Sequence, residues 1–112
     1  MGYYTSYKLT IHEPSSYVGF ITEKVVIEGF RKASDGANYS LTEDGNTAQS
    51  TKWYDHEEDL CRFSRMHPEI VFKLRGDGEE SGDQWFLYVK NGKSQRCKAK
   101  ITFEDYDEQK LV

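Results

Sequence analysis

The stretch that decides the fold runs from Lys52 to Gly92 and reads KWYDHEEDLCRFSRMHPEIVFKLRGDGEESGDQWFLYVKNG. Asp55 and Glu58 have the spacing of a capping box, which predicts that a helix begins there. His67-Pro68 ends that helix, because the residue before a proline disfavours helical geometry. The apolar stripe predicted between these marks consists of Leu60, Phe63 and Met66.

The second half of this stretch changes to the period of two that is typical of strands. Glu69–Arg75 and Asp83–Lys90 are predicted strands, and the acidic, glycine-rich segment Gly76–Gly82 connects them. Asn91-Gly92 predicts a tight hairpin turn, after which Lys93–Glu104 returns as the last long strand. The polar tail, residues 105–112, is expected to be loosely held.

The N-terminal part begins with a predicted strand, Tyr3–His12, in which Tyr7, Leu9 and Ile11 share one face. Pro14-Ser15-Ser16 breaks it and offers a hydroxyl cap to a helix over Tyr17–Ala33. A strand is the alternative for this segment, because its centre is β-branched. The stripe predicted for the helix consists of Val18, Ile21, Val25 and Phe30.

Ala37–Thr42 and Thr47–Tyr54 are predicted to form a hairpin around the turn Glu43–Asn46. The predicted order is then strand, helix, strand, strand, helix, strand, with one further hairpin. This order predicts an α+β fold on the ferredoxin-like βαββαβ plan, with an added C-terminal β-hairpin and two helices on one face of an antiparallel sheet.

Composition favours one domain over residues 1–112, with many aromatic residues (eight Tyr, six Phe and two Trp) supplying the core. The net charge of −4 argues against generic DNA binding by the whole chain. Cys61 and Cys97 have no neighbour at metal-ligand spacing, so we expect buried thiols, with a disulfide as the alternative. No signal peptide and no run of 18 apolar residues is found, so we expect a cytoplasmic protein without membrane contact.

The predicted sheet would leave one face uncovered, and that face would be basic although the chain is acidic. If Trp85, Leu87 and Val89 face the helices, the residues between them face away. Across the hairpin turn we expect Cys97, Ala99 and Ile101 to point inward. The uncovered face would then carry Lys73, Arg75, Phe86, Tyr88, Lys90, Arg96, Lys98 and Lys100, joined by Lys8 and Tyr54. Such faces often serve solubility alone, so a solvated surface is the alternative to a binding site.

Acidic side chains gather in three other places. They are Asp55, Glu57, Glu58 and Asp59 at the helix start, Asp77, Glu79, Glu80 and Asp83 in the glycine-rich connection, and the segment Glu104–Glu108. Acidic residues in a first helical turn are favoured by the helix dipole, and the loop lacks the spacing of an EF-hand. No cofactor or metal motif is found, although His56 with Asp55 or Asp59 would suit a metal-assisted hydrolase.

The matching residues Lys52-Trp53, Leu60, Phe63, His67-Pro68 and Gly92 resemble those of small ferredoxin-like proteins carried by phages and mobile genetic elements. The resemblance implies no known activity, but it implies interference with a host protein or nuclease. The leading hypothesis is therefore a small non-enzymatic binding protein, of the inhibitor or anti-defence type, with a protein partner.

Two other hypotheses stay open. The uncovered face would suit single-stranded nucleic acid stacked on Phe86 and Tyr88, and the acidic clusters would suit a basic partner. The oligomeric state is left open, because the last strand forms an exposed edge whose lysines oppose pairing.

Overall fold

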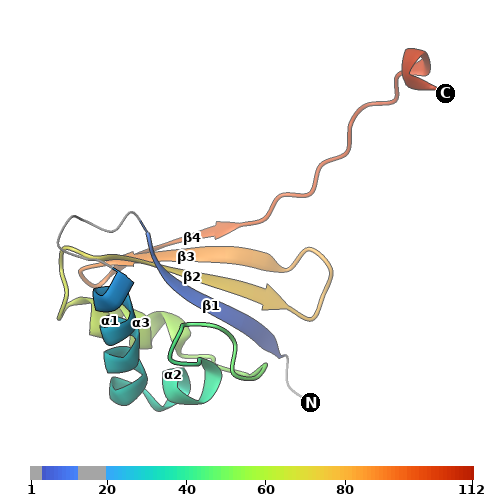
Figure 1. Cartoon of the computed structure of the whole chain (residues 1–112). Coiled ribbons are helices and arrows are strands. Elements are labelled where there is room, and N and C mark those ends of the chain that lie inside the picture. Colours follow the sequence, from blue (N-terminus) through green and yellow to red (C-terminus); the bar gives the residue numbers. More distant parts are fainter. Residues whose placement is uncertain (1–3, 13–19) are drawn as a thin grey trace.

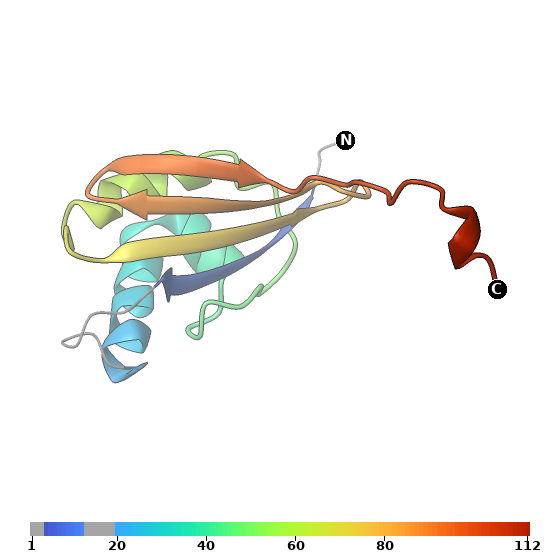
Figure 2. The ribbon, with the colours of Figure 1, turned by 90° about the horizontal axis from the view of Figure 1, so that it is seen from above.

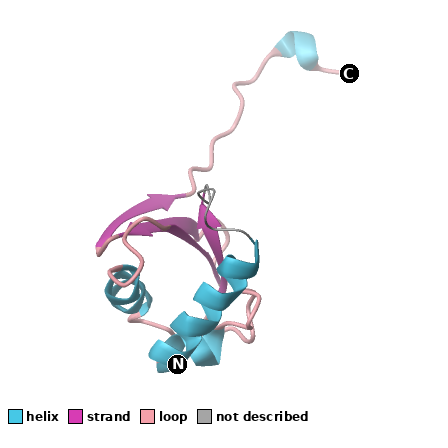
Figure 3. Cartoon of the chain, turned by 60° about the vertical axis from the view of Figure 1, so that its left-hand side comes forward, coloured by secondary structure: helices cyan, strands magenta, loops and turns pink. Residues whose placement is uncertain are grey.

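Four strands form one antiparallel sheet in the computed structural model, which describes residues 4–12 and 20–112. Each strand pairs with the next one along the chain, so the sheet is a meander. The three α-helices of the described residues lie in the connection between the first two strands and cover one face of the sheet (Figures 1 and 3). The elements are β1 (Thr5–His12), α1 (Phe20–Ala33), α2 (Asp35–Ser40), α3 (His56–Ser64), β2 (Val71–Gly78), β3 (Gln84–Lys90), β4 (Lys93–Lys98) and the 3₁₀ turn η1 (Glu108–Lys110).

The core lies between the sheet and the helices. Leu9, Leu74 and Leu87 are paired across β1, β2 and β3 and are fully buried, so they form one apolar row on the helix side. The prediction that Tyr7, Leu9 and Ile11 face inward is confirmed. The helices and loops complete this core with Val26, Ile27, Phe30, Ala37, Leu41, Trp53, Leu60 and Phe63.

The helix predicted for Tyr17–Ala33 is confirmed from Phe20 onward, and its first residues, with the Pro14–Ser16 cap, lie outside the described residues. The predicted stripe was wrong at Val25, which is 65% exposed. Phe30 anchors the buried face of α1, and Val26 and Ile27 lie four and three residues before it, on the same side of the helix. Val18 lies outside the described residues, as does the side chain of Ile21.

The ferredoxin-like order is wrong, because the hairpin predicted from Ala37 to Tyr54 does not form. Asp35–Ser40 is a helix instead, and the Ser34 side chain accepts a hydrogen bond from the Ala37 amide at its start. Thr47–Tyr54, the other predicted strand of this hairpin, belongs to an irregular loop with isolated bridges. The fold is therefore a four-stranded meander with three helices rather than βαββαβ.

This loop closes the outer edge of β1. Thr5 exchanges two backbone hydrogen bonds with Thr51, and the Leu9 amide donates to the Gly45 carbonyl at 2.8 Å. Gly45 has a φ of +83° in the turn predicted at Glu43–Asn46, which is confirmed. The free edge of the first strand is thus covered by the chain itself.

Helix α3 begins where the sequence indicates but ends at Ser64, before the predicted His67-Pro68, and two further details differ. Asp55 stands at the N-cap without a side-chain capping bond, so the predicted capping box is wrong. Leu60 and Phe63 are buried as expected, whereas Met66 is 69% exposed because the helix ends at Ser64.

The last strands differ from the prediction mainly in length. Strand β2 continues to Gly78, because Gly76 lets the indole ring of Trp85 lie directly over its backbone. Asn91 and Gly92 have φ angles of 47° and 79°, which confirms the tight turn. Strand β4 ends at Lys98 rather than at Glu104, and the following residues extend away from the sheet (Figure 1).

Candidate functional site

The sheet face turned away from the helices gathers positive charge around two aromatic rings. Lys73 is paired with Tyr88 and Arg75 with Phe86, so their side chains share one side of the sheet. Lys8 is paired with Arg75 and joins them from β1. We call this surface the open face. Of the residues predicted for it, those that lie on it are Lys8, Lys73, Arg75, Phe86, Tyr88 and Lys90.

Three predicted members of this face lie elsewhere. Arg96 is paired with Leu87 and Lys98 with Trp85, so both point to the helix side. The two-residue turn decides this, because it pairs Lys90 with Lys93 and thereby fixes the face of every later residue. Lys100 lies beyond the end of the strand.

The predicted positions of two other residues, Cys97 and Tyr54, were also wrong. Cys97, expected inside, is paired with Phe86 and belongs to the open face. Tyr54 lies in the loop before α3 and is not part of the sheet. His12 was not predicted for the open face, although the period of two in β1 places it beside Lys8 and Thr10.

The aromatic rings of the open face contact a cation of the chain itself, the Lys73 ammonium. The Lys73 Nζ atom lies 4.2 Å from the centre of the Phe86 ring and 5.9 Å from that of Tyr88. The His12 ring meets Tyr88 edge to face, with centroids 5.1 Å apart. Among the described residues, no ion pair neutralises Lys73, Arg75 or Lys90. The face therefore offers uncompensated cations more than bare ring surfaces.

A hollow of about 290 Å³ lies where Arg75, Phe86 and Cys97 meet near the start of β3. The three residues come from three neighbouring strands, and Phe86 stands between the other two. An exposed guanidinium beside an aromatic ring suits a carboxylate or another planar anionic group. The hollow is thus the place on the open face where such a group would fit.

On the opposite side of the sheet, His56 joins α3 to β4. Its Nδ1 atom lies 2.8 Å from the Trp53 carbonyl, which only accepts, so Nδ1 carries the proton. Its Nε2 atom lies 2.9 Å from Arg96, which only donates, so Nε2 accepts. Arg96 also binds Glu57 at 3.0 Å and lies over the Trp85 ring. These contacts hold α3 against β4 around a neutral His56 imidazole, and we call this group of residues the clasp.

The pKa values of this clasp follow from its surroundings. Burial lowers the pKa of His56 below its ordinary value, and the nearby Arg96 charge acts in the same direction. The hydrogen bond from Ser94, followed by that from Arg96, lowers the pKa of Glu57. Both ring nitrogens of His56 are occupied, so neither is free to bind a metal ion.

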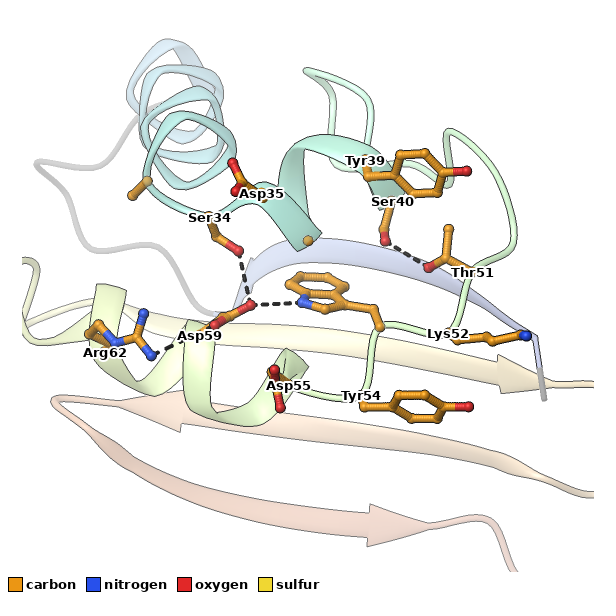
Figure 4. A pocket seen from close by; sticks show the side chains of 13 residues that line it. Ser34, Asp35, Tyr39, Ser40, Thr51, Lys52, Tyr54, Asp55, Asp59 and Arg62 are labelled. Carbon is orange, nitrogen blue, oxygen red and sulfur yellow. Dashed lines mark hydrogen bonds and ion pairs between the residues drawn. The ribbon is translucent and has the colours of Figure 1, made fainter. Parts of the chain in front are cut away.

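A hollow of about 770 Å³ opens between α2 and α3 (Figure 4). At its floor Asp59 accepts hydrogen bonds from Trp53 Nε1 at 2.9 Å and from Ser34 Oγ at 3.0 Å. Ser40 and Thr51 hydrogen-bond each other at 2.7 Å on another wall. These polar groups hydrogen-bond to one another and hold the helices together. We therefore interpret the hollow as a structural junction between α2 and α3 rather than as a reactive centre.

The predicted acidic residues are dispersed over separate elements. Glu57 and Asp59 have the partners just described, whereas Asp55 and Glu58 are exposed at the start of α3. Asp77 lies at the end of β2, and Glu79, Glu80 and Asp83 lie in the β2–β3 connection. Across residues 4–12 and 20–112, no group of three or more His, Cys, Asp or Glu side chains is arranged to hold a metal ion. The hydrolase hypothesis therefore gains no support from this arrangement.

Comparisons with protein-family models, with curated proteins and with solved structures gave no match for this chain. In the part of the chain that the structure describes, no helix has the length and apolar character needed to span a bilayer. Cys61 and Cys97 are both free thiols, so the alternative of a disulfide is wrong.

Proposed function

We propose that this protein is a small non-enzymatic binding protein whose open face binds an acidic segment of a protein partner. The observation that carries this proposal is the uncompensated charge of Lys73, Arg75 and Lys90 around two aromatic rings, in a chain of net charge −4. A surface that only needed solubility would not require cations of one sign to gather there.

The contacts of Lys73 favour carboxylates over nucleobases as ligands. Its ammonium lies over Phe86 and within reach of Tyr88, so it occupies ring surface on which bases would otherwise stack. A partner carboxylate can instead approach this ammonium and the neighbouring Arg75 without displacing either ring. We therefore place an acidic, extended peptide segment across β2 and β3.

The biological setting belongs to the same proposal. The resemblance of Lys52-Trp53 and His67-Pro68 to small proteins of phages and mobile elements supports a host protein as the target and inhibition as the outcome. We propose that the protein acts in the cytoplasm.

One observation favours a second candidate, binding of single-stranded nucleic acid. The hollow beside Arg75 and Phe86 would admit a planar base, with the guanidinium next to its phosphate. This candidate requires binding to weaken steeply with salt.

Fluorescence anisotropy with two labelled probes tests the proposal: a peptide rich in Glu and Asp, and an oligo-dT strand of similar charge. We expect the peptide to bind more tightly, and Lys73→Glu with Arg75→Glu to weaken it about tenfold or more, by replacing attraction with repulsion. The matched control is Lys32→Glu with Lys52→Glu, which makes the same charge change at exposed residues off the open face.

Tighter binding of oligo-dT would favour the second candidate. Equal losses in both double variants would show that net charge rather than the open face controls binding. Circular dichroism of each variant establishes that the fold is retained.

A further inference from the structure

Residues 99–112, which we call the arm, follow β4. Ala99 still donates to the Gln84 carbonyl at 2.8 Å and the Ile101 side chain lies near Gly82, and the later residues extend away from the rest of the described chain (Figures 1 and 2). Every residue of the arm is exposed. Ile101 is 64% exposed and Phe103 is 89% exposed, although both are large apolar side chains. Apolar residues gathered on an extended segment mark a surface that another chain covers.

The arm continues the strand pattern of β4. Cys97, Ala99, Ile101 and Phe103 alternate with polar residues, which is the period of a strand with one apolar side. No glycine, proline or asparagine interrupts this pattern between Lys93 and Phe103. A segment of this pattern can add to an open sheet edge of another chain.

The sheet has an edge that can receive such a strand. The outer amides of β1 are used internally, since Tyr7 donates to Thr47 Oγ1 at 2.8 Å and Ile11 donates to Glu23 Oε2 at 3.0 Å. On β4, the turn makes Lys90 and Lys93 a hydrogen-bonded pair, so alternate residues of β4 direct their backbone groups outward. Within the described residues no hydrogen bond reaches the outward backbone groups of Ser94, Arg96 and Lys98.

Charge is divided along β4 and the arm. The first part of this segment, residues 93–100, carries Lys93, Arg96, Lys98 and Lys100 and no acidic residue. Its second part carries Glu104, Asp105, Asp107 and Glu108, and its one basic residue is Lys110. Two copies placed antiparallel bring basic halves against acidic halves, whereas a parallel pair would oppose like charges.

We propose that two copies of this chain pair antiparallel through β4 and the arm, around a twofold axis near Thr102. In this register Lys100 of each copy faces Glu104 of the other, and Ile101 faces Phe103. The lysines that would oppose pairing of two identical basic edges are thereby matched by carboxylates. The two sheets then form one continuous sheet, and the two open faces lie next to each other on the same side of it.

A charge-swap experiment on the full chain tests this pairing. The first variant carries Lys98→Glu and Lys100→Glu, and the second carries Glu104→Lys and Glu108→Lys. In the homodimer of either variant, position 100 of one copy faces a like charge at position 104 of the other, so we expect the dimer dissociation constant to rise about tenfold or more. An equimolar mixture restores basic against acidic halves, so we expect it to form a heterodimer.

Sedimentation equilibrium measures all three samples and the wild type. The proposal expects about twice the chain mass for the wild type and for the mixture, and a shift toward the monomer for each variant alone. A monomeric wild type at high concentration overturns it, as does a mixture no more associated than its components. None of these substitutions lies on the open face, so their outcome is independent of the peptide-binding test.

Discussion

Asp59 should be the most stabilising carboxylate of the helical layer, because both of its hydrogen bonds come from buried or nearly buried donors. Trp53 is 6% exposed and Ser34 is 9% exposed, and both donate to the same Oδ2 atom. Replacing Asp59 by alanine leaves the indole N–H and the hydroxyl without this acceptor.

The size of the loss follows from these two donors. An unsatisfied buried donor costs about 1–3 kcal/mol. Water from the adjoining hollow can reach the vacated position, so we take the lower end and expect about 2 kcal/mol for Asp59→Ala. Arg62 lies 3.8 Å from the carboxylate and is 68% exposed, so its ion pair adds little.

Asp59→Asn separates the hydrogen bonds from the charge. Because one oxygen accepts both bonds, the amide oxygen of asparagine can replace it, and we expect a loss below about 1 kcal/mol. Glu58→Ala is the matched control, because Glu58 is exposed on the same helix and should change stability by less than about 0.5 kcal/mol.

Urea unfolding followed by tryptophan fluorescence measures these differences. With a urea dependence of about 1–3 kcal/mol per molar, Asp59→Ala should lower the midpoint by about 1 M at an unchanged slope. The reasoning is refuted if Asp59→Ala behaves like Glu58→Ala, or if Asp59→Asn loses as much as Asp59→Ala.

Four further predictions concern pH and glycine positions. Acidification from about pH 6.5 downward should weaken the fold, because the lowered pKa of His56 means that the unfolded chain takes up this proton first. Urea midpoints across this range should fall in the wild type, and this component should be absent in His56→Gln. Gly76→Ala should cost about 1–3 kcal/mol, because its Cβ atom would lie 2.0 Å from the Trp85 ring. Thermal unfolding should show that loss, and a smaller one when Trp85→Leu is already present. Gly92→Ala should cost about 1–2 kcal/mol, because φ is +79° there. Gly29→Ala, whose Cβ atom has ordinary contact distances inside α1, should stabilise by about 0.5–1 kcal/mol in the same assay.

The sequence allowed prediction of the elements whose pattern is local. The period of two in β1 and β3, and the turn residues Asn91 and Gly92, were sufficient for these parts of the sheet. Helix α2 was missed although its N-cap, Ser34, could be read from the sequence. Its Gly36 lies against the indole ring of Trp53, where a Cβ atom would come within 2.3 Å of Nε1.

The open face was predicted on β2 and β3 but wrongly on β4. The apolar residues Cys97, Ala99 and Ile101 suggested an inward set, yet the two-residue turn pairs Leu87 with Arg96 and decides otherwise. The turn length was available from the sequence and outweighs apolar character in fixing the register. The apolar residues Ala99, Ile101 and Phe103 after Lys98 are exposed and are not part of the core.

The most direct test of the open face is an NMR titration of the ¹⁵N-labelled chain with the acidic peptide. The account predicts that the largest amide shifts occur at Lys73, Arg75, Phe86 and Tyr88, and that they vanish in the Lys73→Glu, Arg75→Glu variant. Shifts centred instead on the hollow around Asp59, or an absence of shifts at low ionic strength, would contradict the assignment of binding to this face.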